Sequence, residues 1–187
     1  ASMAGAARIS FMKVLNIHER ELEADAARIG ALIDSLASKE DRLWPKHVWP
    51  RMAFDRPLGV GANGGHGPIR YFVEAYKPGE SITFRFTGPK GFDGFHGFEL
   101  ISGPNQRVVL RHTLSMTTHG HEVVSWPLVF RPMHDALIED SLATAQESLG
   151  ETPIIQPWSL WVKILRWVVS GGKARSQAIL SASTTAG

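Results

Sequence analysis

Residues 69–87 decide the fold: they read Ile69-Arg70-Tyr71-Phe72-Val73-Glu74-Ala75-Tyr76, then Lys77-Pro78-Gly79-Glu80, then Ser81-Ile82-Thr83-Phe84-Arg85-Phe86-Thr87. A Pro-Gly turn between two alternating segments is typical of a β-hairpin. The pattern continues in residues 95–101 and 107–118, which are separated by the Gly- and Pro-containing loop 102–106. We therefore expect a run of hairpins that forms an antiparallel sheet.

Helical patterns lie on both sides of these hairpins. After a first strand expected over residues 9–18, an apolar stripe at helical spacing predicts a helix over 21–36. Residues 38–50 contain two Trp-Pro pairs and are expected to form a short second helix or a loop, because residues before proline avoid the α region. A short strand is expected over residues 51–57.

A long helix is expected after the hairpins. It runs from Trp126 or Pro127 to Leu149, with Gly150 as its stop and a kink at Pro132. The order of elements has no βαβ alternation and no internal repeat, which disfavours parallel-sheet and solenoid folds. The predicted class is α+β, with a curved antiparallel sheet wrapped around a long C-terminal helix and two short helices after the first strand.

Strand parity predicts which side chains face that helix, because successive side chains point to opposite faces. In the last hairpin, a turn centred near Pro104 would pair His96 with His112. It would also pair Leu100 with Val108 and Phe98 with Leu110. Both histidines then face inward, since a one-residue slip would turn an apolar set outward.

Two inward imidazoles suggest either ligand binding or acid–base catalysis. His96 and His112 can hydrogen-bond a ligand carbonyl or hydroxyl, or one of them can act as a general base. The alternative is that both are satisfied core residues. His134 and Asp135, on the long helix, are candidates for the same polar cluster, although Asp135 is expected to face solvent.

Composition limits the alternatives. The 187 residues, 43% hydrophobic and 20% charged, are typical of one globular domain with a tail. Because the chain has no cysteine, disulfides, thiolate metal sites and a cysteine nucleophile are excluded, and a reducing, cytoplasmic setting fits. The net charge of +2 comes from scattered residues, so nucleic-acid binding is not expected. No apolar run is long enough to span a bilayer.

Two motif-like patterns lack the context that their chemistry needs. Gly59, Gly61 and Gly64 match a dinucleotide-binding fingerprint by spacing, but a strand rather than a helix follows, so residues 59–67 are expected to form a flexible hairpin loop or a gate over a cavity mouth. Metal-capable side chains show no compact ligand spacing, and neither a metal nor a cofactor is expected. These side chains are His66, Asp93, His96, His112, His119, His121 and His134.

The segment 157–169 is rich in tryptophan and carries Lys163 and Arg166. This pattern predicts an amphipathic helix that packs on the domain, meets a second subunit or lies on a membrane surface. The residues expected to make a membrane or homodimer contact are Trp158, Trp161, Leu165 and Trp167. Residues 171–187 are Ser-, Ala- and Thr-rich and are expected to be disordered.

The order of elements and several short segments resemble a bacterial branch of the SRPBCC superfamily, which includes START-like, birch-pollen-allergen-like and polyketide-cyclase-like proteins. The resemblance covers residues 9–149. It is carried by Phe54-Asp55-Arg56-Pro57-Leu58-Gly59-Val60-Gly61, Gly67-Pro68-Ile69-Arg70-Tyr71, Phe84-Arg85-Phe86, Gly91-Phe92-Asp93-Gly94 and Arg111-His112-Thr113-Leu114. It implies a helix-grip fold with a cavity for sterols, lipids, plant hormones, polyketides or aromatic substrates, and no catalytic residue carries over.

We therefore expect a helix-grip domain over 9–150, a Trp-rich helix over 151–170 and a tail over 171–187. The expected function is binding or carriage of a small apolar molecule; the alternatives are a cyclase- or dehydratase-like enzyme, and an adaptor acting through the Trp-rich helix. The expected ligand-binding residues are Tyr71, Val73, Phe84, Phe86, His96, Phe98, Leu110, His112, Leu114 and His134. Complete filling of the cavity by these side chains would leave them as core alone.

Overall fold

The computed structural model describes residues 11–103, 107–173 and 177. The expectations for residues 1–10, for Pro104 to Gln106 and for most of the tail lie outside these residues. The strands are β1 (Phe11–Leu22), β2 (Ala53–Phe54), β3 (Asn63–His66), β4 (Ile69–Lys77), β5 (Ser81–Gly88), β6 (Phe92–Ser102) and β7 (Val108–His119). The helices are α1 (Ala26–Asp34), α2 (Glu122–Ser125), the π-helical segment η2 (Trp126–Phe130), α3 (Arg131–Leu149) and α4 (Leu160–Val169).

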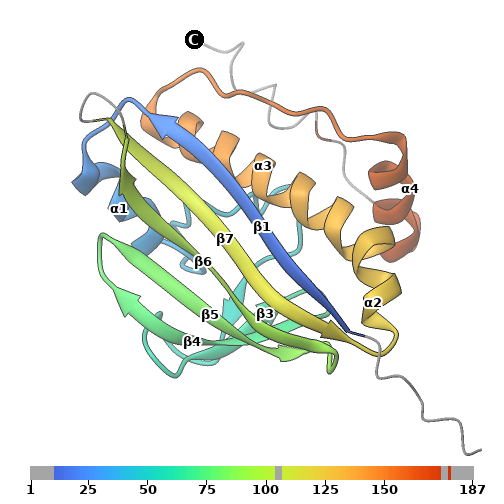
Figure 1. The fold of residues 1–187 in the computed structure, drawn as a ribbon. Coiled ribbons are helices and arrows are strands. Elements are labelled where there is room, and N and C mark those ends of the chain that lie inside the picture. The colour runs from blue at the N-terminus through green and yellow to red at the C-terminus, as the bar shows by residue number, and fades with distance from the viewer. Residues whose placement is uncertain (1–10, 104–106, 174–176, 178–187) are drawn as a thin grey trace, which may run out of the picture.

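The strands form one antiparallel seven-stranded sheet in the order β1-β7-β6-β5-β4-β3-β2. The sheet curves around α3, and α4 lies beside the α2 end of the helical run (Figure 1). This arrangement confirms the predicted α+β class and the long C-terminal helix. It also leaves β1, at one edge of the sheet, in contact with α3.

The register of the last hairpin differs from the prediction by two residues. His112 pairs with Phe98, and His96 pairs with Leu114, rather than the two histidines with each other. The pairing of Ser102 with Val108, together with a hydrogen bond from Gly103 N–H to the Arg107 carbonyl, sets this register. A two-residue shift keeps every side chain on its predicted face. Both histidines are therefore buried on the inner face, as predicted.

The first helix is shorter than predicted. Glu21 and Leu22 belong to β1, and α1 begins only at Ala26, where the Asp25 side chain accepts a hydrogen bond from Arg28 N–H. An aspartate at this position satisfies an N–H group that the first helical turn leaves free. The expected helix over 21–36 thus combined the end of a strand with a capped helix.

Residues 38–50 form turns and bends, which is the loop alternative of the prediction rather than a second short helix. The Asp41 carboxylate accepts hydrogen bonds from the backbone N–H groups of Ala37, Leu43 and Trp44. A side chain that binds neighbouring backbone groups in this way competes with helix formation. The segment nevertheless brings Leu43, Trp44 and Trp49 into the core.

The Gly-rich segment was predicted to be a flexible loop, but part of it is the strand β3, which pairs with both β2 and β4. The expected strand over 51–57 is reduced to the two residues of β2. A Cβ atom at Gly64 would lie 2.0 Å from the Ala53 carbonyl oxygen, so only glycine allows β2 to approach this closely. Asn63, Gly64 and Gly65 give β3 no apolar alternation, and periodicity could not detect it.

The helical run before α3 begins at Glu122, four residues earlier than predicted, and passes through η2, which ends two residues before Pro132. Proline has no N–H group, so it leaves the carbonyl four residues earlier without its helical donor. That carbonyl belongs to Leu128, and it accepts a hydrogen bond from the Trp161 indole of α4. Gly150 ends α3 with a left-handed φ of 84°, as predicted for a helix stop.

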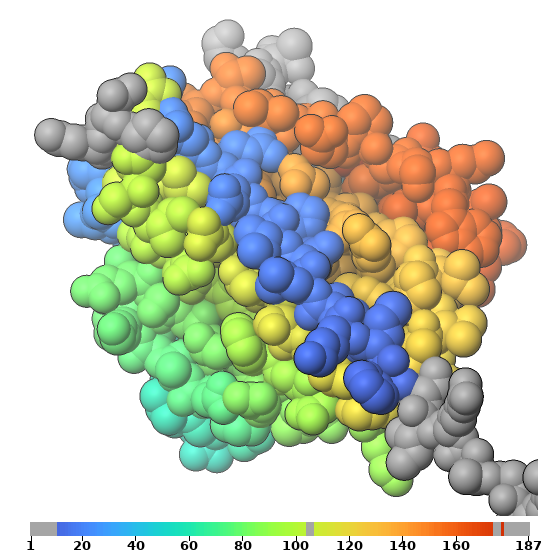
Figure 2. Space-filling model, in the orientation of Figure 1, coloured from blue at the N-terminus to red at the C-terminus, as the bar shows by residue number. Residues whose placement is uncertain are grey.

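The helix α4 is fixed to the core by a buried polar group. The Asp140 carboxylate on α3 accepts hydrogen bonds from the indoles of Trp49, at 2.7 Å, and Trp158, at 2.8 Å. The Arg166 guanidinium of α4 lies 4.0 Å from the Trp49 ring and 4.2 Å from the Trp158 ring. Because Trp158 and Val162 also belong to the main hydrophobic cluster, α4 packs as part of the folded unit. In Figure 2 residues 151–173, coloured orange to red, form a band against α3.

Candidate functional site

A cavity of about 270 Å³ lies between the inner face of the sheet, the helical run and the segment before β2. Among the residues that the structure describes, no Asp, Glu, Lys or Arg side chain lines it. Its walls are apolar and aromatic apart from four histidines. The lining residues are Trp44, Trp49, Pro50, His66, Gly67, Pro68, Ile69, Phe86, Phe92, His96, His112, Leu114, Trp126, Val129, Phe130, Met133, His134, Leu137, Ile138 and Val169.

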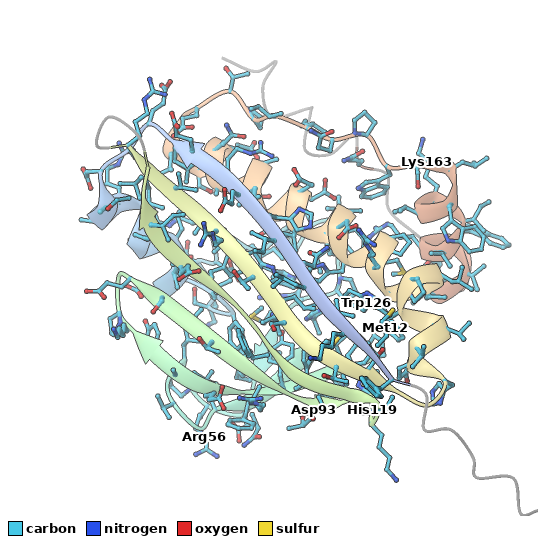
Figure 3. The ribbon with its side chains drawn as sticks, viewed as in Figure 1. Met12, Arg56, Asp93, His119, Trp126 and Lys163 are labelled. Carbon is cyan, nitrogen blue, oxygen red and sulfur yellow. The ribbon has the colours of Figure 1, made fainter. Side chains whose placement is uncertain are left out.

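The tryptophan of η2 lines the helical side of the cavity. Trp126 is buried, packs edge-on against Phe92 and belongs to a second hydrophobic cluster. Met12 of β1 packs against this cluster, and Figure 3 shows both labelled side chains in the region where β1 meets the helical run. The exposed lining residues Pro50, Gly67, Pro68 and Val169 lie at the surface end of the cavity.

The four lining histidines, His66, His96, His112 and His134, are here called the imidazole cluster. Their rings form a chain of contacts with aromatic neighbours: His96 lies 5.6 Å from His112, and His112 lies 5.1 Å from His134, between ring centroids. His66 is joined to the cluster through Tyr71, whose hydroxyl lies 2.9 Å from His66 Nδ1. Three strands and one helix, far apart in sequence, therefore supply the cluster.

Burial keeps the imidazole cluster neutral. It lowers the pKa of His66 to about 3, and it holds the pKa of His96 and of His112 well below the usual range. The pKa of His134 is also lowered by burial. Each neutral ring carries one N–H donor and one acceptor nitrogen. The cluster therefore offers hydrogen-bonding groups without charge.

Several ring nitrogens of the cluster have no hydrogen-bond partner among the described residues. They are His96 Nε2, His112 Nδ1 and both nitrogens of His134, all of which are buried. A buried polar atom without a partner costs about 1–3 kcal/mol, so such atoms are rare in folded proteins. Their presence in the wall of an apolar cavity is typical of a ligand site.

A second polar group lies beside the cavity, where the edge strand β1 meets α3. Asn16, His18 and Arg20 alternate along β1 and face Asp135 and Glu139 of α3; we call these five residues the β1–α3 seam. His18 Nδ1 lies 2.7 Å from Glu139 Oε1, and His18 Nε2 lies 3.2 Å from Asp135 Oδ1. Asn16 donates to Asp135 at 2.8 Å, and Arg20 donates to Glu139 at 2.7 Å.

Unlike the cavity, where the imidazoles are neutral, the β1–α3 seam favours the charged forms of its histidine and its carboxylates. Burial alone disfavours a charged imidazole, but the carboxylates of Asp135 and Glu139 raise the pKa of His18 to about 9. Burial likewise opposes the ionised carboxyl of Asp135, yet its polar neighbours lower its pKa. Asp135 was expected to face solvent, and its side chain is 35% exposed, with Oδ1 engaged in the seam and Oδ2 lying 3.7 Å from Arg131.

The structure divides the ten predicted ligand-binding residues into two groups. Five of them line the cavity: Phe86, His96, His112, Leu114 and His134. The other five are buried in the main core behind the wall: Tyr71, Val73, Phe84, Phe98 and Leu110. Parity identified the inward face correctly for both groups, but it does not tell which inward residues face empty space.

Several site residues were missed in the sequence. His66 was considered only as a metal-capable side chain, because β3 was not recognised, and His18 was not considered at all. The alternation of Asn16, His18 and Arg20 along β1 was the available signal, since their parity matches that of the apolar Met12 and Val14. Polar residues at inward positions of a strand predict a polar partner on the element opposite.

The predicted surface residues near the C-terminus also fall into two groups. Trp158 and Leu165 are buried within the domain, whereas Trp161 and Trp167 are exposed on α4. Lys163 is exposed on the same helix and points outward in Figure 3. Leu160, Ile164 and Val168 are exposed as well. No helix within the described residues is both long enough and apolar enough to cross a bilayer.

Comparison with known proteins identifies the fold. We find no match to a protein-family model or to a curated protein. A protein from Thermobifida fusca superimposes with a TM-score of 0.54 at 12% identity, covering 76% of this chain and 99% of that one. Truncated norcoclaurine synthase from Thalictrum flavum gives 0.54 at 14% identity, covering 79% and 100%. A protein from Nitrosospira multiformis gives 0.51 at 17% identity, covering 72% and 95%.

These similarities define the class of protein: the chain has a helix-grip fold, as predicted. At such low identity they extend to the fold alone. The particular features of this chain are the imidazole cluster in its cavity, the β1–α3 seam beside it and the added helix α4.

Proposed function

We propose that the protein binds a small, mostly apolar molecule in the cavity between the sheet and α3. The observation that carries this proposal is an apolar cavity of about 270 Å³ whose wall holds buried imidazole nitrogens without partners. A ligand that fills the space and hydrogen-bonds these nitrogens would remove both the void and the unsatisfied polar atoms. The SRPBCC resemblance supports the same reading.

The chemistry of the walls favours a neutral ligand with a hydroxyl or carbonyl group. Placing a charge among uncharged walls and neutral imidazoles would be costly. The cavity is also slightly smaller than the roughly 300–1,000 Å³ typical of drug-sized ligands. Among the lipids, polyketides and aromatic compounds that the resemblance suggests, the volume favours compact aromatic molecules.

In this proposal Phe86 and Leu114 contact the ligand directly, and His96, His112 and His134 supply its hydrogen bonds. The core residues Tyr71, Val73, Phe84, Phe98 and Leu110 would support the wall from behind. The proposed setting is the cytoplasm, in line with the absence of cysteine.

Native mass spectrometry tests the proposal. The purified protein is measured before and after incubation with an extract of lipids and polyketides, with its denatured mass as the control. We expect an adduct of small mass that disappears on denaturation. The absence of an adduct under every loading condition would contradict the proposal and would favour the C-terminal helix as the functional element.

A second candidate is an acid–base enzyme of the cyclase or dehydratase type. Its supporting observation is the contact of His96 Nδ1 with His112 Nε2, at 3.4 Å, inside the apolar cavity. Each neutral imidazole keeps an acceptor nitrogen that could take a proton from a bound substrate, but burial lowers its pKa and so makes it a weaker base than a free imidazole, which places this candidate second. Conversion of the ligand that is recovered in the mass measurement, rather than its unchanged release, would distinguish an enzyme from a carrier.

A third candidate is an adaptor that uses the exposed face of α4, with Trp161 and Trp167, on a membrane or a second copy of the chain. Removing residues 157–187 would also remove the buried Trp158, so surface substitutions are the better test. We expect Trp161→Ser with Trp167→Ser to abolish liposome binding or dimerisation, whereas Leu160→Ser alone should weaken it less. Wild-type protein that neither binds liposomes nor dimerises would contradict this candidate.

A further inference from the structure

Three side chains at the junction of β1 and α3 carry an inference that does not depend on the cavity ligand. His18, His134 and Asp135 each offer one ligand atom, and these atoms all lie within 4.8 Å of one another. Each of the three side chains is buried or half-buried. We infer that they form a binding site for one divalent transition-metal ion.

The spacing of the atoms suits a metal ion. His18 Nε2 lies 3.2 Å from Asp135 Oδ1, and His134 Nδ1 lies 3.7 Å from the same oxygen. Ligand atoms that lie about 2.0–2.2 Å from a zinc ion are roughly 3–3.6 Å apart from each other. The His134 imidazole has no hydrogen bond that would oppose a small rotation toward the other two side chains.

The neighbouring residues hold His18 as metal-binding histidines are commonly held. Its Nδ1 lies 2.7 Å from Glu139 Oε1, and Glu139 is itself held by Arg20. A histidine that binds a metal usually donates its other ring N–H to a carboxylate, which fixes the tautomer and the ring orientation. With Nδ1–H donating to Glu139, the lone pair of Nε2 faces a carboxylate oxygen. A cation must lie there, either a proton on Nε2 or a metal ion.

His134 provides the second, independent observation. Both of its ring nitrogens are buried and neither has a hydrogen-bond partner among the described residues. A proton shared by His18 and Asp135 leaves His134 Nδ1 without a hydrogen bond, whereas a metal ion bound by all three residues occupies that nitrogen and leaves His134 Nε2 to the cavity ligand.

An ion can reach the site from outside. Asp135 and Glu139 line a second, more open hollow between α3 and residues 156–162. His134 also lines the ligand cavity, so the site connects the surface with that cavity. Two imidazoles and one carboxylate favour a first-row transition ion such as Zn²⁺ or Fe²⁺ over Mg²⁺ or Ca²⁺. Three protein ligands leave a position open on the ion.

Titration calorimetry of the metal-stripped full-length chain with ZnCl₂ and with CoCl₂ tests the inference. We expect one ion per chain. His18→Gln, His134→Gln and Asp135→Asn should each weaken the affinity at least about tenfold, and Glu139→Gln by about 10–100-fold. His121→Gln is the matched control, because the His121 side chain is 88% exposed on the surface, and it should leave the affinity unchanged.

X-ray absorption of the wild-type Co²⁺ complex does not depend on the folding of any variant. It should show scattering from two imidazoles. The inference is overturned if the wild-type protein binds no ion, if His18→Gln and His134→Gln bind as tightly as the wild type, or if the absorption spectrum shows no imidazole ligand. The seam would then be an ion pair with a proton in place of the metal.

Discussion

His112 Nε2 lies 3.4 Å from His96 Nδ1, although the two residues are diagonal rather than directly opposite neighbours on β6 and β7. Whichever imidazole donates in this contact, one of the two remaining nitrogens carries a proton and the other carries a lone pair. The remaining nitrogens, His96 Nε2 and His112 Nδ1, have no partner among the described residues. The pair therefore offers one free donor and one free acceptor, which suits a hydroxyl group in either orientation.

His112→Leu should leave the fold intact and weaken binding of a hydroxylated ligand. We choose 1-naphthol as the probe and naphthalene as its matched control, because the two differ only in the hydroxyl. Loss of one hydrogen bond should reduce the 1-naphthol affinity by up to about tenfold in calorimetry and leave the naphthalene affinity nearly unchanged. An unchanged 1-naphthol affinity would remove His112 from the site.

Leu114→Phe should fill part of the cavity and exclude the ligand. Leu114 lines the cavity, whereas Leu110 lies four residues earlier on the same face of β7 in the packed core. Leu110→Phe should therefore destabilise the protein by about 1–3 kcal/mol, since the core has no space for a larger side chain. Leu114→Phe should lower the free energy of unfolding, measured in urea, by less than Leu110→Phe does. It should also reduce the affinity for 1-naphthol at least about tenfold. Equal costs for the two substitutions would indicate that the cavity is closed in solution.

Asp140→Leu should destabilise the protein by about 2–5 kcal/mol, because it leaves the indoles of Trp49 and Trp158 without their buried acceptor and removes the negative charge near Arg166. Asp140→Asn keeps a carbonyl oxygen in place and serves as the control, with a smaller loss. Urea unfolding followed by tryptophan fluorescence measures both effects. Similar stabilities of the Leu and Asn variants would show that the indole hydrogen bonds contribute little.

Stability should fall as the pH drops below about 6.5, because burial lowers the pKa of His66 to about 3. Between these two values the unfolded chain binds a proton that the folded chain excludes. The free energy of unfolding therefore decreases by about 1.4 kcal/mol per pH unit for such a group. The titratable groups that act on His66 are His134 and Arg70, and its ring faces Tyr71.

His66→Gln isolates this contribution. Glutamine can still hydrogen-bond the Tyr71 hydroxyl but does not titrate. Between about pH 7 and pH 5, the slope of the unfolding free energy against pH should therefore become smaller, by an amount that corresponds to the uptake of close to one proton on unfolding. The wild-type protein, measured in the same buffers, gives the reference slope. If His66→Gln keeps the wild-type slope, His66 is not excluded from protonation in the folded state.

The sequence predicted the parts of the fold whose pattern is regular. Alternation in β4 to β7 identified the inward face, and every residue predicted to bind the ligand is inside the protein, with only His134 less than fully buried. The register was wrong by two residues because alternation has a period of two and cannot distinguish pairings that differ by that amount. The pairing of Ser102 with Val108 depends on the loop, which the alternation does not define.

The sequence could not predict which inward residues surround a void. Phe84 and Phe86 have the same parity and residue type, yet only Phe86 lines the cavity. The difference arises from the helical run and from residues 44–50, whose positions depend on tertiary contacts such as Trp49 with Asp140. The glycine-rich β3 and the polar half of β1 were missed because neither has an apolar pattern.

A crystal structure of the protein with 1-naphthol tests the central claim most directly. We expect the naphthalene rings to lie between Phe86, Leu114 and Met133, with the hydroxyl within hydrogen-bond distance of His96, His112 or His134. A cavity closed by rearranged side chains, or a ligand bound only outside it, would contradict the claim that this fold encloses an apolar molecule held by neutral imidazoles.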